Sequence, residues 1–180
     1  MKPEVCSMEF FEVLKSRHSV RKFKEKEVEE EKLKKILEAA NLAPSAGDLQ
    51  AYEIVVVRDK EGKEKLASAA YEQESISQAP LVLVFLTHPE RSSRKYSRRG
   101  AELYCLQDAA IASSYAQLAA AALGLGCVWV GAFDENEVAK AVNAEGDSKP
   151  VSMLPIGYAD EQPRVTRRRE LDELVHKEKL

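Results

Sequence analysis

The sequence predicts an α/β or α+β domain: a three-layer α-β-α sandwich in which a mixed central sheet is wrapped by helices. Two observations predict this class. The short runs Tyr52–Arg58 and Pro80–Thr87 are apolar and rich in β-branched residues over most of their length, as expected of buried strands. The segments around them carry apolar residues at helical spacing, so helices alternate with strands along the chain.

Length and composition limit the remaining possibilities. A chain of 180 residues is long enough for one domain with its own core, and we expect residues 1–180 to form a single domain. The net charge of −3 gives no general attraction to nucleic acid or anionic lipid, so neither is expected as a partner. No apolar run could span a bilayer and the N-terminus lacks the apolar stretch of a signal peptide, which leads us to expect a cytoplasmic location.

The first segment predicts a helix followed by a basic loop. Ser7 is a suitable N-cap, and the next residues place Phe10, Val13 and Leu14 on one helical face. The helix is expected to end at the stretch SRHSVRKF. This stretch contains three cations, Arg17, Arg21 and Lys22, in a chain with a net negative charge. A second amphipathic helix fits residues 28–43, with glutamates near its start, where the helix dipole favours negative charge.

The middle of the chain predicts further helices and one unstructured segment. Residues 59–73 look helical. Residues 88–100 are polar and carry no periodicity, so we expect an exposed loop that shapes access to a site. Ala101–Leu123 is alanine-rich and apolar on several faces, which predicts a long helix buried in a core or between subunits.

The C-terminal part predicts two short strands and a tail. The glycines of GLGCVWVGAF end the long helix, and a short strand follows at Cys127–Val130. Asp134, with Glu137 three positions on, has the spacing of a capping box, which predicts another helix. A last core strand lies in KPVSMLPIGYAD. The final twenty residues are basic and then amphipathic.

Familiar catalytic motifs do not account for the function. The GLG triplet follows a helix and precedes a strand, the reverse of a dinucleotide fingerprint. The three histidines have no paired spacing, the three cysteines form no CxxC, and Ser45 lacks the GxSxG context, so no metal site and no protein nucleophile is expected. Three basic clusters remain, and phosphate is one ligand that would require them, although each cluster alone is more typical of a solvated surface than of a site.

Several segments in a fixed order resemble one family. RHSVRKF is similar to an R-x-S-x-R-x-F element, and APSAGDLQAYEIVVV to a P-S-x-x-N-x-Q-P-W segment. LGLGCVWVGAFD is similar to a glycine-rich strand entry, and LPIGYADEQPRVTRRRELDELV to a closing L-P-I-G-Y segment with a basic run. Together these segments resemble the FMN-dependent nitroreductase-like flavoproteins. That family folds as a mixed sheet wrapped by helices and forms homodimers with FMN at the subunit interface.

The resemblance implies a role for each matched residue. Arg17 and Ser19, with His18 between them, would lie near the ribityl phosphate, and Arg21 would reach the pyrimidine edge of the ring. Three further groups would complete the site: a wall from the other subunit, contacts around flavin N5, and a second phosphate-binding group in the tail. The tail, around residues 160–180, would pack on the partner subunit. The residues implied for these three groups are Pro44, Ser45, Ala46 and Asp48; Gln73 with the backbone amides of Val130, Gly131 and Ala132; and Arg167 and Arg168.

The implied activity is electron transfer through bound FMN. NADH or NADPH would give a hydride to the flavin, and a nitroaromatic, a quinone or free flavin would take the electrons, with no catalytic side chain required. Two other outcomes stay open: a different reaction on the same scaffold, such as flavin destruction or reductive dehalogenation, and a dimeric flavin-binding module without turnover. Asp48 departs from the family pattern, which has Asn at this position, and Ala51 and Tyr52 replace Pro-Trp.

Overall fold

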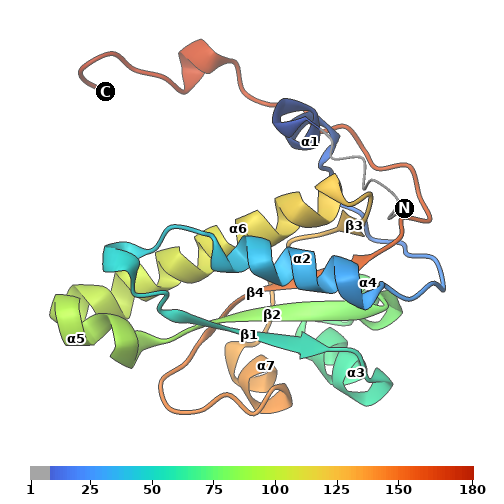
Figure 1. The fold of residues 1–180 in the computed structure, drawn as a ribbon, viewed down its shortest axis with the longest axis horizontal. Coiled ribbons are helices and arrows are strands. Elements are labelled where there is room, and N and C mark those ends of the chain that lie inside the picture. The colour runs from blue at the N-terminus through green and yellow to red at the C-terminus, as the bar shows by residue number, and fades with distance from the viewer. Residues whose placement is uncertain (1–8) are drawn as a thin grey trace, which may run out of the picture.

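The computed structural model describes residues 9–180 and shows a sheet between two layers of helices (Figure 1). Ser7, the expected first N-cap, lies outside the described residues. The helices are α1 (Phe10–Ser16), α2 (Glu30–Asn41), α3 (Lys60–Ala69), α4 (Glu74–Gln78), α5 (Pro89–Arg99), α6 (Cys105–Ala122) and α7 (Glu135–Ala141). The strands are β1 (Tyr52–Val57), β2 (Leu81–Thr87), β3 (Gly126–Cys127) and β4 (Pro150–Gly157). Short turns of 3₁₀ helix occupy Ala46–Asp48 and Leu171–Glu173, and a π-helix occupies Gly100–Tyr104.

The sheet has the strand order β1-β2-β4-β3, and its four strands pair antiparallel. The predicted α+β class is confirmed. Within residues 9–180, parallel pairing occurs only as an isolated bridge between Ser19 and Cys127, whereas the strand-to-strand pairings of the sheet, expected to be mixed, are all antiparallel. The expected strand at Cys127–Val130 is shorter than predicted: β3 ends at Cys127, and Val130 forms an isolated bridge with Met153 of β4.

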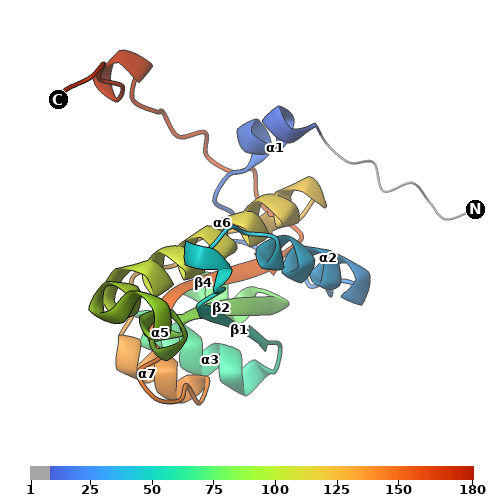
Figure 2. The same ribbon diagram turned by 60° about the vertical axis from the view of Figure 1, so that its left-hand side comes forward.

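The central strand β2 contributes to both hydrophobic cores because its side chains alternate between the two faces of the sheet. Leu81, Leu83 and Phe85 pack in the core that includes α2 and α6, whereas Val82 and Val84 pack in the core that includes α3 and α7. All five side chains are at most 1% exposed. The uninterrupted apolar run in the sequence therefore reflects a strand covered on both faces, as Figures 1 and 2 show.

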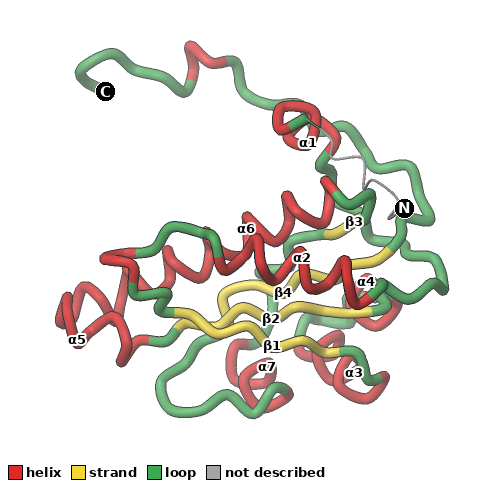
Figure 3. Tube along the Cα trace, viewed as in Figure 1, coloured by secondary structure: helices red, strands yellow, loops and turns green. Residues whose placement is uncertain are grey.

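Most of residues 88–100 form helix α5 (Pro89–Arg99), so the prediction of an irregular loop is wrong. Figure 3 shows α5 in red at the end of the molecule. Pro89 occupies the first turn, where its missing N–H costs nothing. Salt bridges one turn apart join Arg94 to Glu90 and Arg98 to Glu102. These charge pairs and the burial of Ser92 stabilise the helix. Because the helix has no continuous apolar face, the hydrophobic pattern of the sequence does not indicate it.

The long helix α6 packs its alanines against α2 and the sheet, as predicted from its composition. Ala112, Ala116 and Ala120 are fully buried in the core shared with α2. The opposite side of the helix is not covered in the single chain, where Leu106 is 45% and Tyr115 is 40% exposed. Burial on all sides, as expected from the sequence, would therefore require something outside this chain.

The two ends of the described chain extend away from the body of the fold. Only Val13 of α1 is buried, whereas Phe10 is 59% and Leu14 is 43% exposed, so the predicted apolar face does not pack within this chain. The tail after the sheet is extended, and its amphipathic part forms only the short turn Leu171–Glu173. Figures 1 and 2 show α1 and the tail on the same side of the molecule, beyond α6.

The predicted cap of α7 provides a test of the fold. Asp134 Oδ1 accepts hydrogen bonds from the backbone N–H groups of Asn136, at 2.9 Å, and Glu137, at 3.0 Å. We expect Asp134→Ala to lower the free energy of unfolding by about 1 kcal/mol, since two N–H groups lose their acceptor. Denaturant unfolding followed by circular dichroism measures the change. Asp134→Asn retains an acceptor oxygen and should be nearly neutral; an equal loss in both variants would contradict the cap.

Candidate functional site

The first basic segment lies beside the short strand β3. Ser19 forms the parallel bridge to Cys127, and the N–H of Val20 donates to the Cys127 carbonyl at 3.0 Å. The approach is close because position 126 is glycine: a Cβ there would lie 2.8 Å from Cβ of Val20. The backbone that carries Arg17, His18 and Ser19 is therefore fixed by the sheet rather than by an independent loop.

The chain after β4 holds the same segment from its other side. The N–H of Lys24 donates to the Tyr158 carbonyl and that of Asp160 to the Lys22 carbonyl, both at 2.9 Å. The carboxylate of Glu161 accepts the backbone N–H groups of Arg21, at 2.5 Å, and Lys22, at 3.2 Å. The exposed side chain of Arg21 therefore projects from a backbone that is tied down at both edges.

A cavity of about 230 Å³ opens between this segment and the end of α6. Arg17 and His18 line it on one side; Gly124, Cys127 and Pro163 are among the residues opposite. Arg17 is half-buried, and within residues 9–180 it has no carboxylate partner. A partly desolvated guanidinium without a counter-ion favours an anion in the adjoining cavity.

Cys127 lines the same cavity but is poorly suited to chemistry there. Burial raises the pKa of its thiol to about 12, and the nearby positive charge of Arg17 offsets this only in part. Because a thiolate is the nucleophilic and metal-binding form, the neutral thiol has little reactivity near pH 7. In the described part of the chain, no group of His, Cys, Asp and Glu side chains is arranged to hold a metal ion.

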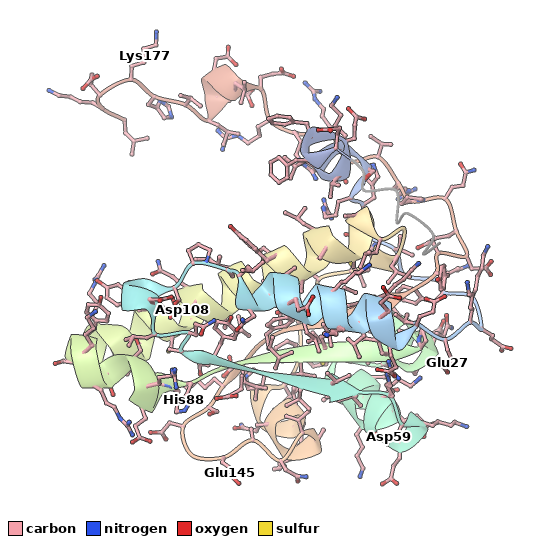
Figure 4. The ribbon with its side chains drawn as sticks, viewed as in Figure 1. Glu27, Asp59, His88, Asp108, Glu145 and Lys177 are labelled. Carbon is pink, nitrogen blue, oxygen red and sulfur yellow. The ribbon has the colours of Figure 1, made fainter. Side chains whose placement is uncertain are left out.

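The segment around Ser45 lies at the opposite end of α6 and is fixed by a buried carboxyl group. Asp108, which is 2% exposed, accepts the N–H of Ala46 at 2.8 Å and that of Ala51 at 3.4 Å. Figure 4 labels Asp108 near the α5 end of α6. Ser45 Oγ accepts the N–H of Gln50 at 2.9 Å, so the turn is also closed on itself.

Asp108 was not predicted from the sequence. A single acidic residue in an alanine-rich helix matches no motif, and only its full burial in the structure distinguishes it. Pro44 and Asp48, in contrast, are exposed, and Asp48 has a positive φ of 58°. Residues 44–48 thus present a rigid, outward-facing surface rather than a pocket within their own chain.

The third predicted group is brought together by a side-chain contact. Gln73 Nε2 donates to the Ala132 carbonyl at 3.2 Å, which joins the start of α4 to the residues after β3. The N–H of Val130 donates to the Met153 carbonyl at 2.9 Å, so this amide is not free for a ligand, contrary to the sequence-based expectation for Val130. Gly131 and Ala132 are exposed.

The tail arginines make contacts only with the tail itself. Arg168 Nη1 donates to the Thr166 carbonyl at 3.3 Å, and Arg167 lies 3.8 Å from the Glu170 carboxylate. Both side chains are exposed. In the single chain they do not join Arg17, so the structure does not bring the two predicted phosphate-binding groups together.

The distance along α6 shows that the site is incomplete in one chain. Asp108 anchors residues 45–51 near one end, and Ala121 lines the Arg17 cavity near the other. Thirteen residues of α-helix separate these two positions by about 20 Å. The basic segment and the Ser45 turn therefore cannot contact the same small ligand ring within one copy.

A larger cavity, of about 880 Å³, contains none of the predicted site residues. It lies between the sheet, the start of α5 and the loop before β4; Figure 4 labels His88 and Glu145, both of which line it. Glu53, Glu90 and Asp147 also line it. Four carboxylates beside one histidine disfavour a phosphate, so size alone does not mark the functional site.

Comparison with known proteins agrees with this architecture. The model of the nitroreductase family matches residues 14–85 and 69–158. An NADH dehydrogenase from Thermus thermophilus is 31% identical over 186 residues, covering 88% of this chain and 91% of the relative. An FMN reductase [NAD(P)H] from Bacillus subtilis is 34% identical over 163 residues, covering 82% and 66% of the two chains. The NADPH:FMN oxidoreductase from Vibrio harveyi, solved in complex with NAD⁺, superposes with a TM-score of 0.87 at 26% identity, covering 95% of this chain and 77% of that one.

The structure predicts that Asp108 controls the order of the Ser45 turn. We expect Asp108→Ala to lower the free energy of unfolding by about 2–3 kcal/mol, because the buried N–H of Ala51 and the partly buried N–H of Ala46 lose their acceptor. Amide hydrogen exchange at Ala46 and Ala51 should accelerate at the same time. Gln107→Ala, at the exposed neighbouring position, should change stability by less than about 0.5 kcal/mol; unchanged exchange in Asp108→Ala would contradict the anchoring role.

Proposed function

The chain belongs to the nitroreductase family and is an NAD(P)H-dependent flavin oxidoreductase, and we propose that FMN is the flavin it binds, between two copies of the chain. The observation that carries the proposal is the half-buried Arg17, without a carboxylate partner among residues 9–180, beside an open cavity. A flavin mononucleotide has one phosphate, which such a guanidinium can bind through charge-assisted hydrogen bonds. His18 and Ser19 lie on the same fixed segment and would complete this end of the site.

A second copy supplies what one chain lacks. The Ser45 turn lies about 20 Å from the Arg17 cavity along α6. In a twofold dimer, residues 44–48 of one copy can face the cavity of the other, where Pro44, Ser45 and Ala46 would form a wall of the flavin site. Asp48 would then offer a carboxylate, which only accepts hydrogen bonds unless it is protonated.

Exposed apolar side chains support this assembly. They occur on three parts of the surface: α1, the outer side of α6 and the tail. The residues are Phe10, Phe11, Leu14, Leu106, Tyr115, Leu171, Leu174 and Val175. A surface of this kind favours a protein partner, and we propose that the tail from about residue 160 packs on the partner and carries Arg167 and Arg168 to a phosphate.

The residues of this chain bind and orient the cofactor rather than react with it. FMN, when bound, would supply the chemistry by accepting a hydride from NADH or NADPH and passing electrons to a small acceptor such as a nitroaromatic, a quinone or free flavin. Arg21 would place a positive charge at the pyrimidine edge, where it stabilises negative charge on the reduced ring. Gly131, Ala132 and Gln73 would lie along the ring beside the reacting nitrogen.

Flavin loading and reduction test the function. We expect the purified protein to bind FMN and its visible absorbance to bleach anaerobically when NADH or NADPH is added, since the donor transfers its hydride to the cofactor. Product analysis with a nitroaromatic, a quinone and FMN would then identify the acceptor. A protein that never binds FMN would refute the proposal. Bound FMN that no donor reduces would favour a binding module, and consumption of the flavin itself would favour flavin destruction.

The phosphate site is tested by a double substitution. We expect Arg17→Ala combined with Arg168→Ala to weaken FMN binding by about a hundredfold or more, because two charge-assisted contacts are lost, each with a tenfold or larger effect. Fluorescence quenching of FMN measures the dissociation constant. Lys15→Ala removes an exposed cation paired with Glu12 and should leave binding unchanged; FMN affinity equal to wild type in the double variant would show that the phosphate lies elsewhere.

A further inference from the structure

A cluster of two cations and two tyrosines lies where α5 meets the π-helix. We call Lys95, Tyr96, Arg99 and Tyr104 the α5 cluster. The rings of Tyr96 and Tyr104 meet edge to face, with centroids 5.1 Å apart and an interplanar angle of 86°. Lys95 Nζ lies 5.4 Å from the Tyr96 centroid, and Arg99 Cζ lies 5.3 Å from the Tyr104 centroid. The cluster therefore combines a pair of aromatic rings with a cation at each side.

The two cations of the cluster differ from their neighbours on α5. Arg94 and Arg98 are paired with Glu90 and Glu102. Lys95 and Arg99 have no carboxylate partner within residues 9–180; Arg99 Nε instead donates to the Tyr104 hydroxyl at 3.0 Å. Both are exposed. Residues 88–104 contain five cations and two carboxylates, so this region carries a net positive charge although the whole chain is net negative. The region therefore attracts anions locally.

The cluster is attached to the Ser45 turn. A Cβ on Gly47 would lie 2.6 Å from Lys95 Nζ and 2.5 Å from the Tyr96 hydroxyl oxygen, so both groups reach over the backbone of that turn. Arg91 Nε donates to the Leu49 carbonyl and links α5 to the same turn. Any molecule that rests against residues 44–48 therefore has Lys95 and Tyr96 of the α5 cluster at its edge.

Backbone irregularities produce this arrangement. Ser97 has φ 48° and ψ −139° in the middle of α5, and the π-helix Gly100–Tyr104 follows directly. Ser97 directly follows Tyr96 and the π-helix ends at Tyr104, so the path of the backbone through both irregular stretches sets the contact between the two rings. Strained non-glycine residues and π-helical turns cost free energy and are concentrated at functional sites.

We propose that the α5 cluster binds the adenosine diphosphate part of the nicotinamide nucleotide, with Lys95 and Arg99 on the phosphates and a tyrosine ring against the adenine. This inference rests on the proposed function, in which residues 44–48 form a wall of the flavin site. With the nicotinamide over that flavin, the rest of the donor has to extend past the edge of the wall, where the cluster lies. A planar base joined to two phosphates matches a site of aromatic rings flanked by cations.

The test compares two charge-matched double variants. Lys95→Gln with Arg99→Gln removes the cluster's cations; Arg94→Gln with Arg98→Gln removes the same amount of charge from the paired positions of the same helix. In the first variant we expect the apparent Kd for NADH and NADPH in anaerobic flavin reduction to rise about tenfold or more, with the limiting rate changed by less than about twofold. The second variant should retain the wild-type Kd within about twofold.

A phosphate-free donor and a direct binding measurement complete the test. Reduction by N-benzyl-dihydronicotinamide should be equal in wild type and Lys95→Gln/Arg99→Gln, because that donor has no group for the cluster to bind. Calorimetry with ADP should show about tenfold weaker binding to the same variant. Equal losses in both double variants, or with the phosphate-free donor, would overturn the proposal. ADP binding is measured without flavin, and FMN content is measured separately, so a failure of the flavin function is distinguished from a failure of the cluster.

Discussion

The packing of α6 against the sheet sets the geometry of every other part of the site. Its buried alanines pack in one core with residues of α2 and β2, which places the helix along the sheet. An 18-residue helix is about 27 Å long. Because it anchors the Ser45 turn through Asp108 near one end and borders the Arg17 cavity at the other, one chain presents two separate halves of a binding surface. This separation is the physical reason for placing the proposed flavin between two copies.

The parts of the fold that the sequence predicted are those in which local pattern and tertiary packing agree. β2 is apolar without interruption because both of its faces are buried, and Asp134 caps α7 through the hydrogen bonds that its position indicated. The long alanine-rich helix and its glycine-containing end follow from composition alone. In each case the residues that determine the structure are neighbours in sequence, or repeat at one period.

The parts that were missed depend on contacts between distant residues or on charge. α5 has mostly polar residues, and its stability comes from paired charges, a buried serine and contacts with the Ser45 turn, none of which gives an apolar period. Asp108 matters because the N–H groups of Ala46 and Ala51, some sixty residues earlier, point at it. The basic segment was recognised as a candidate, but its clamping between β3 and residues 158–161 is visible only in three dimensions. The Val130 amide, expected to be free, is occupied for the same reason: its acceptor, Met153, belongs to a strand that pairs from elsewhere in the chain.

The close approach of Val20 to Gly126 has a consequence for how this protein could change by mutation. Even the methyl group of alanine at position 126 would push Val20 outward. Arg17 lies only three residues before Val20, on the same segment. The affinity for the proposed phosphate can therefore be altered at Gly126, a buried residue that also lines the Arg17 cavity. Directed evolution of the proposed cofactor binding could therefore act at position 126, because a side chain there would displace the segment that carries Arg17 from β3.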